Sequence, residues 1–197
     1  MLTAEPSPSE AALAKGVELW RHTAADGDAL TSEGVRAAVD IGSRLDHGYD
    51  LLISSGAHRA TQTLACLLAG AGLRVPTGVI VDVRFRSDVE DRWREAYERG
   101  GGGDIPSFRK ADPDLLEEES TLLAGALRDV FDRLPNGGRA LIVGHSPMQE
   151  AAIFGLTGRA VAPIPKGAGA VVIEEGDGSY RVEQEIDHAC PEALDHP

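Results

Sequence analysis

The stretch LWRHTAADGDALTSEG, residues 19–34, sets Arg21 and His22 side by side where an apolar run gives way to small and polar residues. A strand-length apolar run at residues 17–20 precedes the pair, and a helical pattern at residues 32–45 follows it. This succession predicts a strand, a loop and a helix, with both polar side chains at the carboxyl end of the strand. Such a pair, taken alone, is more often a surface ion pair or a satisfied strand end than a catalytic site.

Strand-length apolar runs alternate with helix-length patterns along the rest of the chain. The predicted strands are at residues 50–54, 79–83, 140–143, 170–174 and 180–185, and the predicted helices at 59–71, 88–99, 112–135 and 147–156. This alternation predicts βαβ units, and the turn GDGS at residues 176–179 joins the last two strands. We therefore expect an α/β protein, a three-layer α/β/α sandwich with a mostly parallel central sheet.

The 197 residues and the hydrophobic content of 42% suit one globular domain with a sizeable core. The predicted domain covers residues 1–197, with flexible tails at 1–10 and 188–197. Residues 84–112 form a helical insertion that contains the glycine run 100–103 as a flexible joint, and we expect it to act as a cap that shapes substrate choice. Four of its arginines either make the local field positive or form a solvated helix face: Arg84, Arg86, Arg92 and Arg94.

A formal net charge of −13 argues against a nucleic-acid-binding protein and against a protein that binds anionic membranes, because both need clustered lysine and arginine. No apolar run approaches the roughly 20 residues that cross a bilayer, and the N-terminus lacks the basic and apolar regions of a signal peptide. We therefore expect a cytoplasmic protein. Its two cysteines indicate neither a disulfide framework nor a cysteine-rich metal site.

Polar motifs follow three of the predicted strands. Arg21 and His22 follow the first strand, residues 54–59 follow the second, and residues 144–146 follow the strand at 140–143. In open α/β sheets, ligands bind beyond the carboxyl ends of the strands. These three segments are therefore the candidate site.

Four segments of the chain, in the same order, resemble the motifs of the histidine phosphatase superfamily, whose members have the phosphoglycerate mutase-like fold. The family's Arg-His-Gly signature corresponds to residues 21–23 (RHT), and its Leu-Thr-x-x-Gly segment to residues 30–34 (LTSEG). Its Ser-x-x-x-Arg-Ala-x-Gln-Thr block corresponds to residues 55–63 (SGAHRATQT), and its late Gly-His-Ser to residues 144–146. The short link between the first two motifs and the modest chain length are more similar to the compact phosphatase branches than to the mutases.

The resemblance implies that His22 is the catalytic nucleophile and forms a phosphohistidine, while Arg21, Arg59 and His145 bind the phosphoryl oxygens. The chemistry of these residue types agrees with those roles. A neutral imidazole has a lone pair available near pH 7, since its reference pKa is about 6.5. Guanidinium groups supply planar, permanently charged donors for a transferring phosphoryl group.

The activity implied is that of a phosphatase acting on a phosphorylated small molecule or on a phosphoprotein, including protein phosphohistidine. His145 is expected to be cationic when phosphate is bound, because an adjacent anion favours the charged imidazolium. These protein cations can take the place of a magnesium ion, so we expect no metal and no cofactor.

The chain departs from the family pattern at two places. Thr23 stands where the family has glycine, so we expect either a different loop conformation or a hydroxyl that contributes to substrate binding. The family's proton donor is a glutamate in a Leu-x-Glu context, and Ser87 stands at the matching position. Asp88, one residue away, is our first candidate for the proton donor, and Glu90 is the second. Ser87 and Glu90 also fit a capping box, which would make Glu90 structural.

Residues 141–146 allow other interpretations. Ser146 precedes a proline and a predicted helix, so we expect it to cap that helix and to leave backbone N–H groups facing the substrate. The segment also resembles the strand that enters the nucleophile elbow of an esterase, with Ser146 as nucleophile, although Met148 stands where the elbow needs glycine. A third interpretation, a phosphate-binding regulatory module without catalysis, follows from the missing glutamate.

Overall fold

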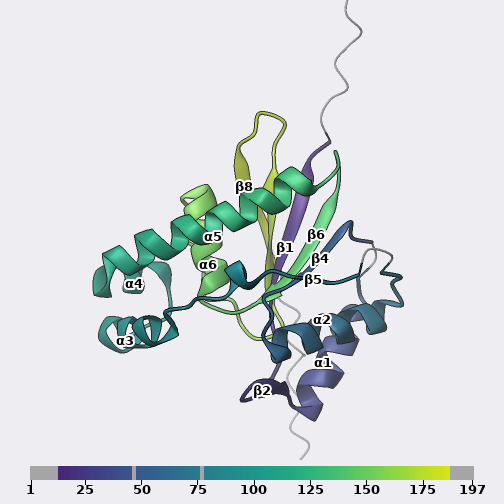
Figure 1. Ribbon diagram of the computed structural model, residues 1–197, viewed down its shortest axis with the longest axis horizontal. Helices are drawn as coiled ribbons and strands as arrows, with labels where there is room; N and C mark the ends of the chain where they lie inside the picture. Colours follow the sequence, from purple (N-terminus) through teal and green to yellow (C-terminus); the bar gives the residue numbers. More distant parts are fainter. Residues whose placement is uncertain (1–12, 46–47, 76–77, 187–197) are drawn as a thin grey trace, which may run out of the picture.

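The computed structural model describes residues 13–45, 48–75 and 78–186, and the predicted tails at 1–10 and 188–197 lie outside these ranges. Within them, six strands form the central sheet in the order β5-β4-β6-β1-β7-β8 (Figure 1). Their bounds are β1 Lys15–Arg21, β4 Leu51–Ser54, β5 Ile80–Val81, β6 Arg139–Gly144, β7 Gly169–Glu174 and β8 Tyr180–Ile186. Strands β5, β4, β6 and β1 pair in parallel, whereas β7 pairs antiparallel with β1 and with β8. The prediction of a mostly parallel sheet is confirmed.

Helices cover both faces of this sheet (Figure 1). The helices are α1 Ser32–Gly42, α2 His58–Ala71, α3 Glu90–Gly100, α4 Ile105–Ala111, α5 Pro113–Arg133 and α6 Met148–Thr157. The pair α1 and α2 packs on one face and the pair α5 and α6 on the other. A short hairpin, β2 Ala25–Asp26 and β3 Ala29–Leu30, precedes α1, and a 3-10 helix, Val83–Phe85, follows β5. None of the helices in the described ranges is long and apolar enough to cross a membrane.

The residues of strand β6 alternate between the two apolar cores that lie on either side of the sheet. Ala140 and Ile142 belong to the core under α5 and α6, and Leu141 and Val143 belong to the core under α1 and α2. Successive side chains of a strand point to opposite faces, and all four of these side chains are fully buried. A central parallel strand therefore needs apolar residues at every position, which is why residues 140–143 are a continuous apolar run.

The insertion contains one helix that the pattern analysis did not predict. Gly101, the C-cap of α3, has a left-handed φ of 69°. Asp104 is the N-cap of α4 and accepts a hydrogen bond from the Ser107 N–H at 2.7 Å. Ile105 and Phe108 of α4 are buried in the core. The glycine run is therefore the turn between two packed helices, and the sequence signal for α4 was its N-cap aspartate followed by a proline.

Helices α1 and α2 pack so closely that glycine is required between them. A Cβ on Gly70 would lie 2.1 Å from the carbonyl oxygen of Val39, and one on Gly42 would lie 2.1 Å from that of Leu67. No side-chain rotation can relieve a clash with backbone, so the two helices would have to separate. Because α2 begins beside Arg59, this packing also sets the position of the Arg59 backbone relative to β1.

We expect Gly70→Ala to lower the free energy of unfolding by at least about 1–3 kcal/mol, because the added methyl group overpacks the contact between the two helices. Gly125→Ala in α5 is the matched control, since a Cβ there meets no atom within 4 Å. This control should gain roughly 0.5–1 kcal/mol from helix propensity. Urea unfolding measures both changes, and a Gly70→Ala variant as stable as the wild type would contradict the close packing.

Candidate active site

The sheet register brings the three polar motifs that follow β1, β4 and β6 to one edge of the sheet. In the parallel ladder, Arg21 at the end of β1 is opposite Gly144 at the end of β6, and Ser54 of β4 is opposite Val143. The ladder continues one residue further, because the His22 N–H donates to the Gly144 carbonyl at 3.1 Å. The residues that follow these three strands are therefore neighbours, as the carboxyl-end rule predicts.

His22 is buried and held in one orientation by its own loop. Its side chain is 6% exposed, and its Nδ1 lies 2.7 Å from the carbonyl oxygen of Thr23. A carbonyl oxygen can only accept, so Nδ1 carries the proton and Nε2 of the neutral ring has the free lone pair. Burial lowers the pKa of His22 to about 4, aided by the positive charges of Arg59 and Arg21 and opposed by the hydrogen bond to Thr23.

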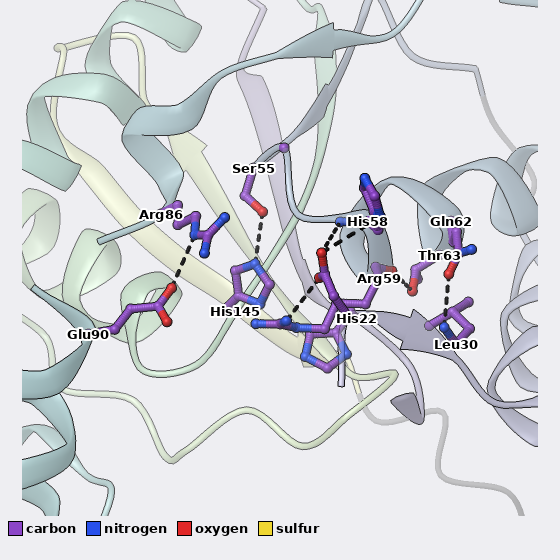
Figure 2. Close-up of polar contacts among 12 residues, drawn as sticks. His22, Leu30, Ser55, His58, Arg59, Gln62, Thr63, Arg86, Glu90 and His145 are labelled. Atoms are coloured by element: carbon purple, nitrogen blue, oxygen red, sulfur yellow. Dashed lines mark hydrogen bonds and ion pairs between the residues drawn. The ribbon is translucent and has the colours of Figure 1, made fainter. Parts of the chain in front are cut away.

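His145 lies against His22, with ring centroids 5.2 Å apart and planes tilted by 60° (Figure 2). Its Nε2 lies 2.9 Å from the hydroxyl oxygen of Ser55, the residue after β4. Burial lowers the pKa of His145 to about 3, and the charges of Arg59, His22 and Arg86 act in the same direction. Both imidazoles are therefore neutral at pH 7 in the ligand-free protein.

Arg59 reaches toward the two histidines from the first turn of α2 (Figure 2). Its Nη1 donates to Oδ1 of Asp28 at 3.0 Å, and Oδ2 of the same carboxylate accepts from the His58 N–H at 3.3 Å. Asp28 lies in the turn between β2 and β3, and the Leu30 N–H of this hairpin donates to Oε1 of Gln62 at 2.8 Å. The hairpin thus holds a carboxylate on the guanidinium of Arg59. Sequence reasoning missed Asp28, because its partner is 31 residues away on another element.

Arg21 is partly buried at the end of β1. Its Nη1 donates to the carbonyl oxygen of Ile164 at 2.8 Å, and its buried Nε has no partner among the described residues. Desolvation lowers the pKa of Arg21 from its usual value, while the charge of Glu150 acts in the opposite direction. The guanidinium therefore has donors left for a ligand.

Thr23 is engaged inside the protein. Its hydroxyl donates to the Gly34 carbonyl at 2.9 Å, and its N–H donates to the Thr63 hydroxyl at 3.2 Å. The predicted contribution of the Thr23 hydroxyl to substrate binding therefore has no support in the geometry. The backbone at Thr23 is ordinary, since no residue other than glycine in the described part of the chain has a positive φ.

A cavity of about 270 Å³ opens beside His145. Its polar lining comprises Arg59, Arg86, Glu90, Arg94, His145 and Ser146, and its apolar lining includes Trp93, Phe108 and Met148. Glu90 is paired with Arg86 through a 3.1 Å contact between Oε1 and Nε (Figure 2). Asp88 does not line this cavity and lies in a neighbouring surface depression. The structure thus brings Glu90, and not Asp88, into one cavity with Arg59 and His145.

Two predicted helix caps are wrong. Helix α3 has Val89 as its N-cap with no side-chain cap, and the Ser87 hydroxyl instead accepts from the Val89 N–H at 3.1 Å. The helix begins too late for Ser87 to cap it, so the capping-box interpretation of Glu90 fails. Helix α6 likewise begins after Pro147 without a side-chain cap.

The hydroxyl of Ser146 donates to Oε1 of Glu150 at 2.6 Å. An esterase nucleophile needs an imidazole base as its hydrogen-bond partner, and this serine has a buried carboxyl instead. The geometry therefore gives no support to the esterase interpretation.

No group of three or more His, Cys, Asp or Glu side chains within the described ranges could hold a metal ion.

No protein-family model and no curated protein sequence matches the chain. Solved structures do match. A phosphoglycerate mutase from Bacillus anthracis superposes with a TM-score of 0.66 at 19% identity, over 88% of this chain and 93% of that one. A phosphoserine phosphatase from Entamoeba histolytica gives 0.67 at 15% identity, over 89% and 98%. The protein histidine phosphatase SixA, complexed with tungstate, gives 0.58 at 18% identity, over 87% and 96%.

These three solved structures share one architecture with this chain. The chain has the phosphoglycerate mutase-like fold, in agreement with the fold that the four motifs implied.

We expect His22 of the ligand-free protein to titrate with a pKa of about 4 and to carry its proton on Nδ1 when neutral. Heteronuclear NMR of histidine-labelled protein, assigned with His22→Gln, measures both properties. Because folding lowers this pKa from about 6.5, the His22 contribution to stability is complete above that pH and is lost as the pH falls through the folded-state value. A His22 that titrates like a free imidazole, or is protonated on Nε2, would rule out the proposed ring geometry.

Proposed function

We propose that the protein is a metal-independent phosphatase that hydrolyses a phosphate monoester or a protein phosphohistidine through a phosphohistidine on His22. The observation that carries this proposal is the neutral His22 ring, whose Nε2 lone pair is free because Nδ1 is bonded to Thr23, next to His145 and Arg59. The fold likeness to a phosphoserine phosphatase and to the protein histidine phosphatase SixA supports the same class of reaction.

In the proposed reaction, the Nε2 lone pair of His22 attacks phosphorus in line with the ester bond. The N–P bond forms as the P–O bond breaks, and the leaving oxygen takes a proton from an acid. Arg21, Arg59 and His145 neutralise the phosphoryl oxygens. Because an adjacent dianion favours the imidazolium, His145 takes up a proton when phosphate binds. Water then attacks the phosphohistidine and gives a proton to the carboxylate left by the acid. The N–P bond breaks with its electron pair returning to Nε2, and inorganic phosphate leaves.

Glu90 is the proton donor that the cavity favours, because it lines the same cavity as Arg59 and His145. In the ligand-free protein its carboxylate is paired with Arg86. An incoming phosphate dianion draws Arg86 away from Glu90 and repels the carboxylate, which favours uptake of the proton that the reaction needs. Residues 84–112 thus act as a cap that supplies the acid and, through Arg94 and Trp93, part of the wall around the leaving group.

The cytoplasmic location of the protein stays a prediction.

The proton donor can be identified by comparing Glu90→Gln with Asp88→Asn. Glu90→Gln should lower kcat about 10²–10⁴-fold for an alkyl phosphate, and much less for p-nitrophenyl phosphate, whose leaving group needs little protonation. Asp88→Asn should stay within about twofold of wild type on both substrates, since Asp88 lies outside the cavity. The reverse ranking of the two variants in steady-state kinetics would assign the acid to Asp88.

The class of activity is tested with p-nitrophenyl phosphate, phosphorylated metabolites and a phosphohistidine protein, all in the presence of EDTA. We expect turnover to survive chelation and to fall to background in His22→Ala, while Ser146→Ala retains measurable turnover, because its hydroxyl takes part in no bond-making step of the proposed reaction. Dependence on added metal would overturn the proposal. Phosphate binding without turnover of any substrate would favour the regulatory module instead.

A further inference from the structure

The proposed reaction makes no use of Glu150, a buried carboxyl group directly behind the site. Glu150 lies in the first turn of α6 and its side chain is 0% exposed. One oxygen, Oε1, accepts two hydrogen bonds, from the Ser146 hydroxyl and from the Ile164 N–H, each at 2.6 Å. The other, Oε2, is buried with no partner among the described residues. Burying a carboxyl group costs free energy unless hydrogen bonds within the protein replace those it made with water. A contribution to stability alone therefore does not explain a glutamate at this position.

The two donors to Glu150 belong to the two sides of the phosphoryl site. Ser146 directly follows His145, which packs on His22. Ile164 lies in the segment between α6 and β7, and its carbonyl oxygen is the one that accepts from the Arg21 guanidinium at 2.8 Å. A single residue, Ile164, therefore contacts both groups: its N–H is bonded to Glu150 and its carbonyl oxygen to Arg21.

The same segment also holds the Arg21 backbone. The Arg21 N–H donates to the Ala168 carbonyl at 2.9 Å, and the Arg21 carbonyl accepts from the Gly167 N–H at 3.2 Å. Glu150 is the only side chain in the described part of the chain that is hydrogen-bonded both to this segment and to the turn after His145. Burial raises the pKa of Glu150, whereas its two hydrogen bonds and the charge of Arg21 act to lower it.

We propose that Glu150 is a positioning residue of the phosphoryl site. Through Ile164 it fixes the Arg21 guanidinium, and through Ser146 it fixes the turn that carries His145, so that both groups meet the phosphoryl oxygens at a set separation. Glu150 itself touches no substrate, because it is fully buried. The inference rests on the proposed function, since it assumes that Arg21 and His145 bind the phosphoryl group.

Two substitutions separate the position of the carboxyl group from its charge. Glu150→Gln keeps the length of the side chain and an oxygen that accepts both hydrogen bonds, but it removes the charge. Glu150→Asp keeps the charge but withdraws the oxygens by one methylene group from Ser146 and Ile164. A positioning role predicts that Asp is the more harmful substitution. A purely electrostatic role predicts that only Gln changes anion binding, and that it strengthens it, because a negative charge near the site is lost.

The affinity of the resting protein for inorganic phosphate is measured by calorimetry, and kcat and KM for p-nitrophenyl phosphate are measured separately. We expect Glu150→Asp to weaken phosphate binding and to lower kcat, each by about tenfold or more, because precise placement of the cations acts in the transition state. Glu150→Gln should stay within about threefold of wild type in both measurements. Glu18→Asp and Glu18→Gln are the matched controls, since Glu18 is a buried glutamate on β1 that is hydrogen-bonded to Trp20. These controls should change stability without changing phosphate affinity.

Two results would overturn the proposal. In the first, Glu150→Asp lowers the melting temperature but leaves phosphate affinity and kcat within about twofold of wild type. In the second, Glu150→Gln binds phosphate more tightly than the wild type does. If the aspartate variant does not fold, Glu150→Ser retains the test, because a short polar side chain also loses both hydrogen bonds. Phosphate binding does not require turnover, so a wild-type protein that binds phosphate without hydrolysing it contradicts the proposed function and leaves the Glu150 test intact. A wild-type protein that binds no phosphate removes both.

Discussion

The parallel pairing of β1 with β6 is the constraint on which the site depends. Because Arg21 is opposite Gly144 in this ladder, the next residues of the two strands, His22 and His145, come into ring contact. A slip of the register by one residue would turn every side chain of β1 to the other face of the sheet. It would move the two histidines apart and turn Val17 and Leu19 out of the core under α5 and α6, so the burial that stabilises the fold also fixes the spacing of the site.

Positively charged side chains surround the two histidines, although the protein as a whole is negatively charged. The chain has a formal net charge of −13, yet cations surround His22 and His145 and help to keep both rings neutral. Each of three arginines has its own carboxyl group: Asp28 is paired with Arg59, Glu90 with Arg86, and Glu150 acts on Arg21 through its charge. The side chains of Asp28 and Glu90 are about half exposed, whereas Glu150 is fully buried. The proposed function therefore places two solvent-accessible carboxylates, which an incoming phosphate displaces, and one buried carboxyl group around the phosphoryl site.

The sequence was most informative where the physical cause is local or repeats along the chain. The six strands of the central sheet and most helices followed from apolar periodicity, whereas the β2–β3 hairpin was not predicted. The proximity of residues 21–22 and 144–146 followed from the rule that parallel strands share one carboxyl edge. Two cap predictions failed because each helix begins one or two residues later than the sequence pattern indicates. Ser87 and Ser146 look like helix caps locally, but the helices begin later, and the two hydroxyl groups bond to Val89 and Glu150 instead. The sequence alone could not decide between Asp88 and Glu90 as proton donor. That choice depends on which carboxylate lines the same cavity as His145 and Arg59, and the cavity lies between elements far apart in the sequence.

Thr23 shows why a departure from a family motif need not disturb the chemistry beside it. Glycine would be required at this position only if the backbone had a positive φ or if another chain segment left no room for a Cβ. Neither condition holds: the backbone at Thr23 is in an ordinary region, and its hydroxyl and N–H each have a partner in α1 or α2. The close approach occurs at Gly34 instead, where a Cβ would lie 2.0 Å from the carbonyl oxygen of Ala24. The loop after His22 is thus held against Gly34 of α1 at two successive residues, by the Thr23 hydroxyl and by the close approach of Ala24. This leaves the Thr23 carbonyl fixed as the acceptor that selects the tautomer of His22.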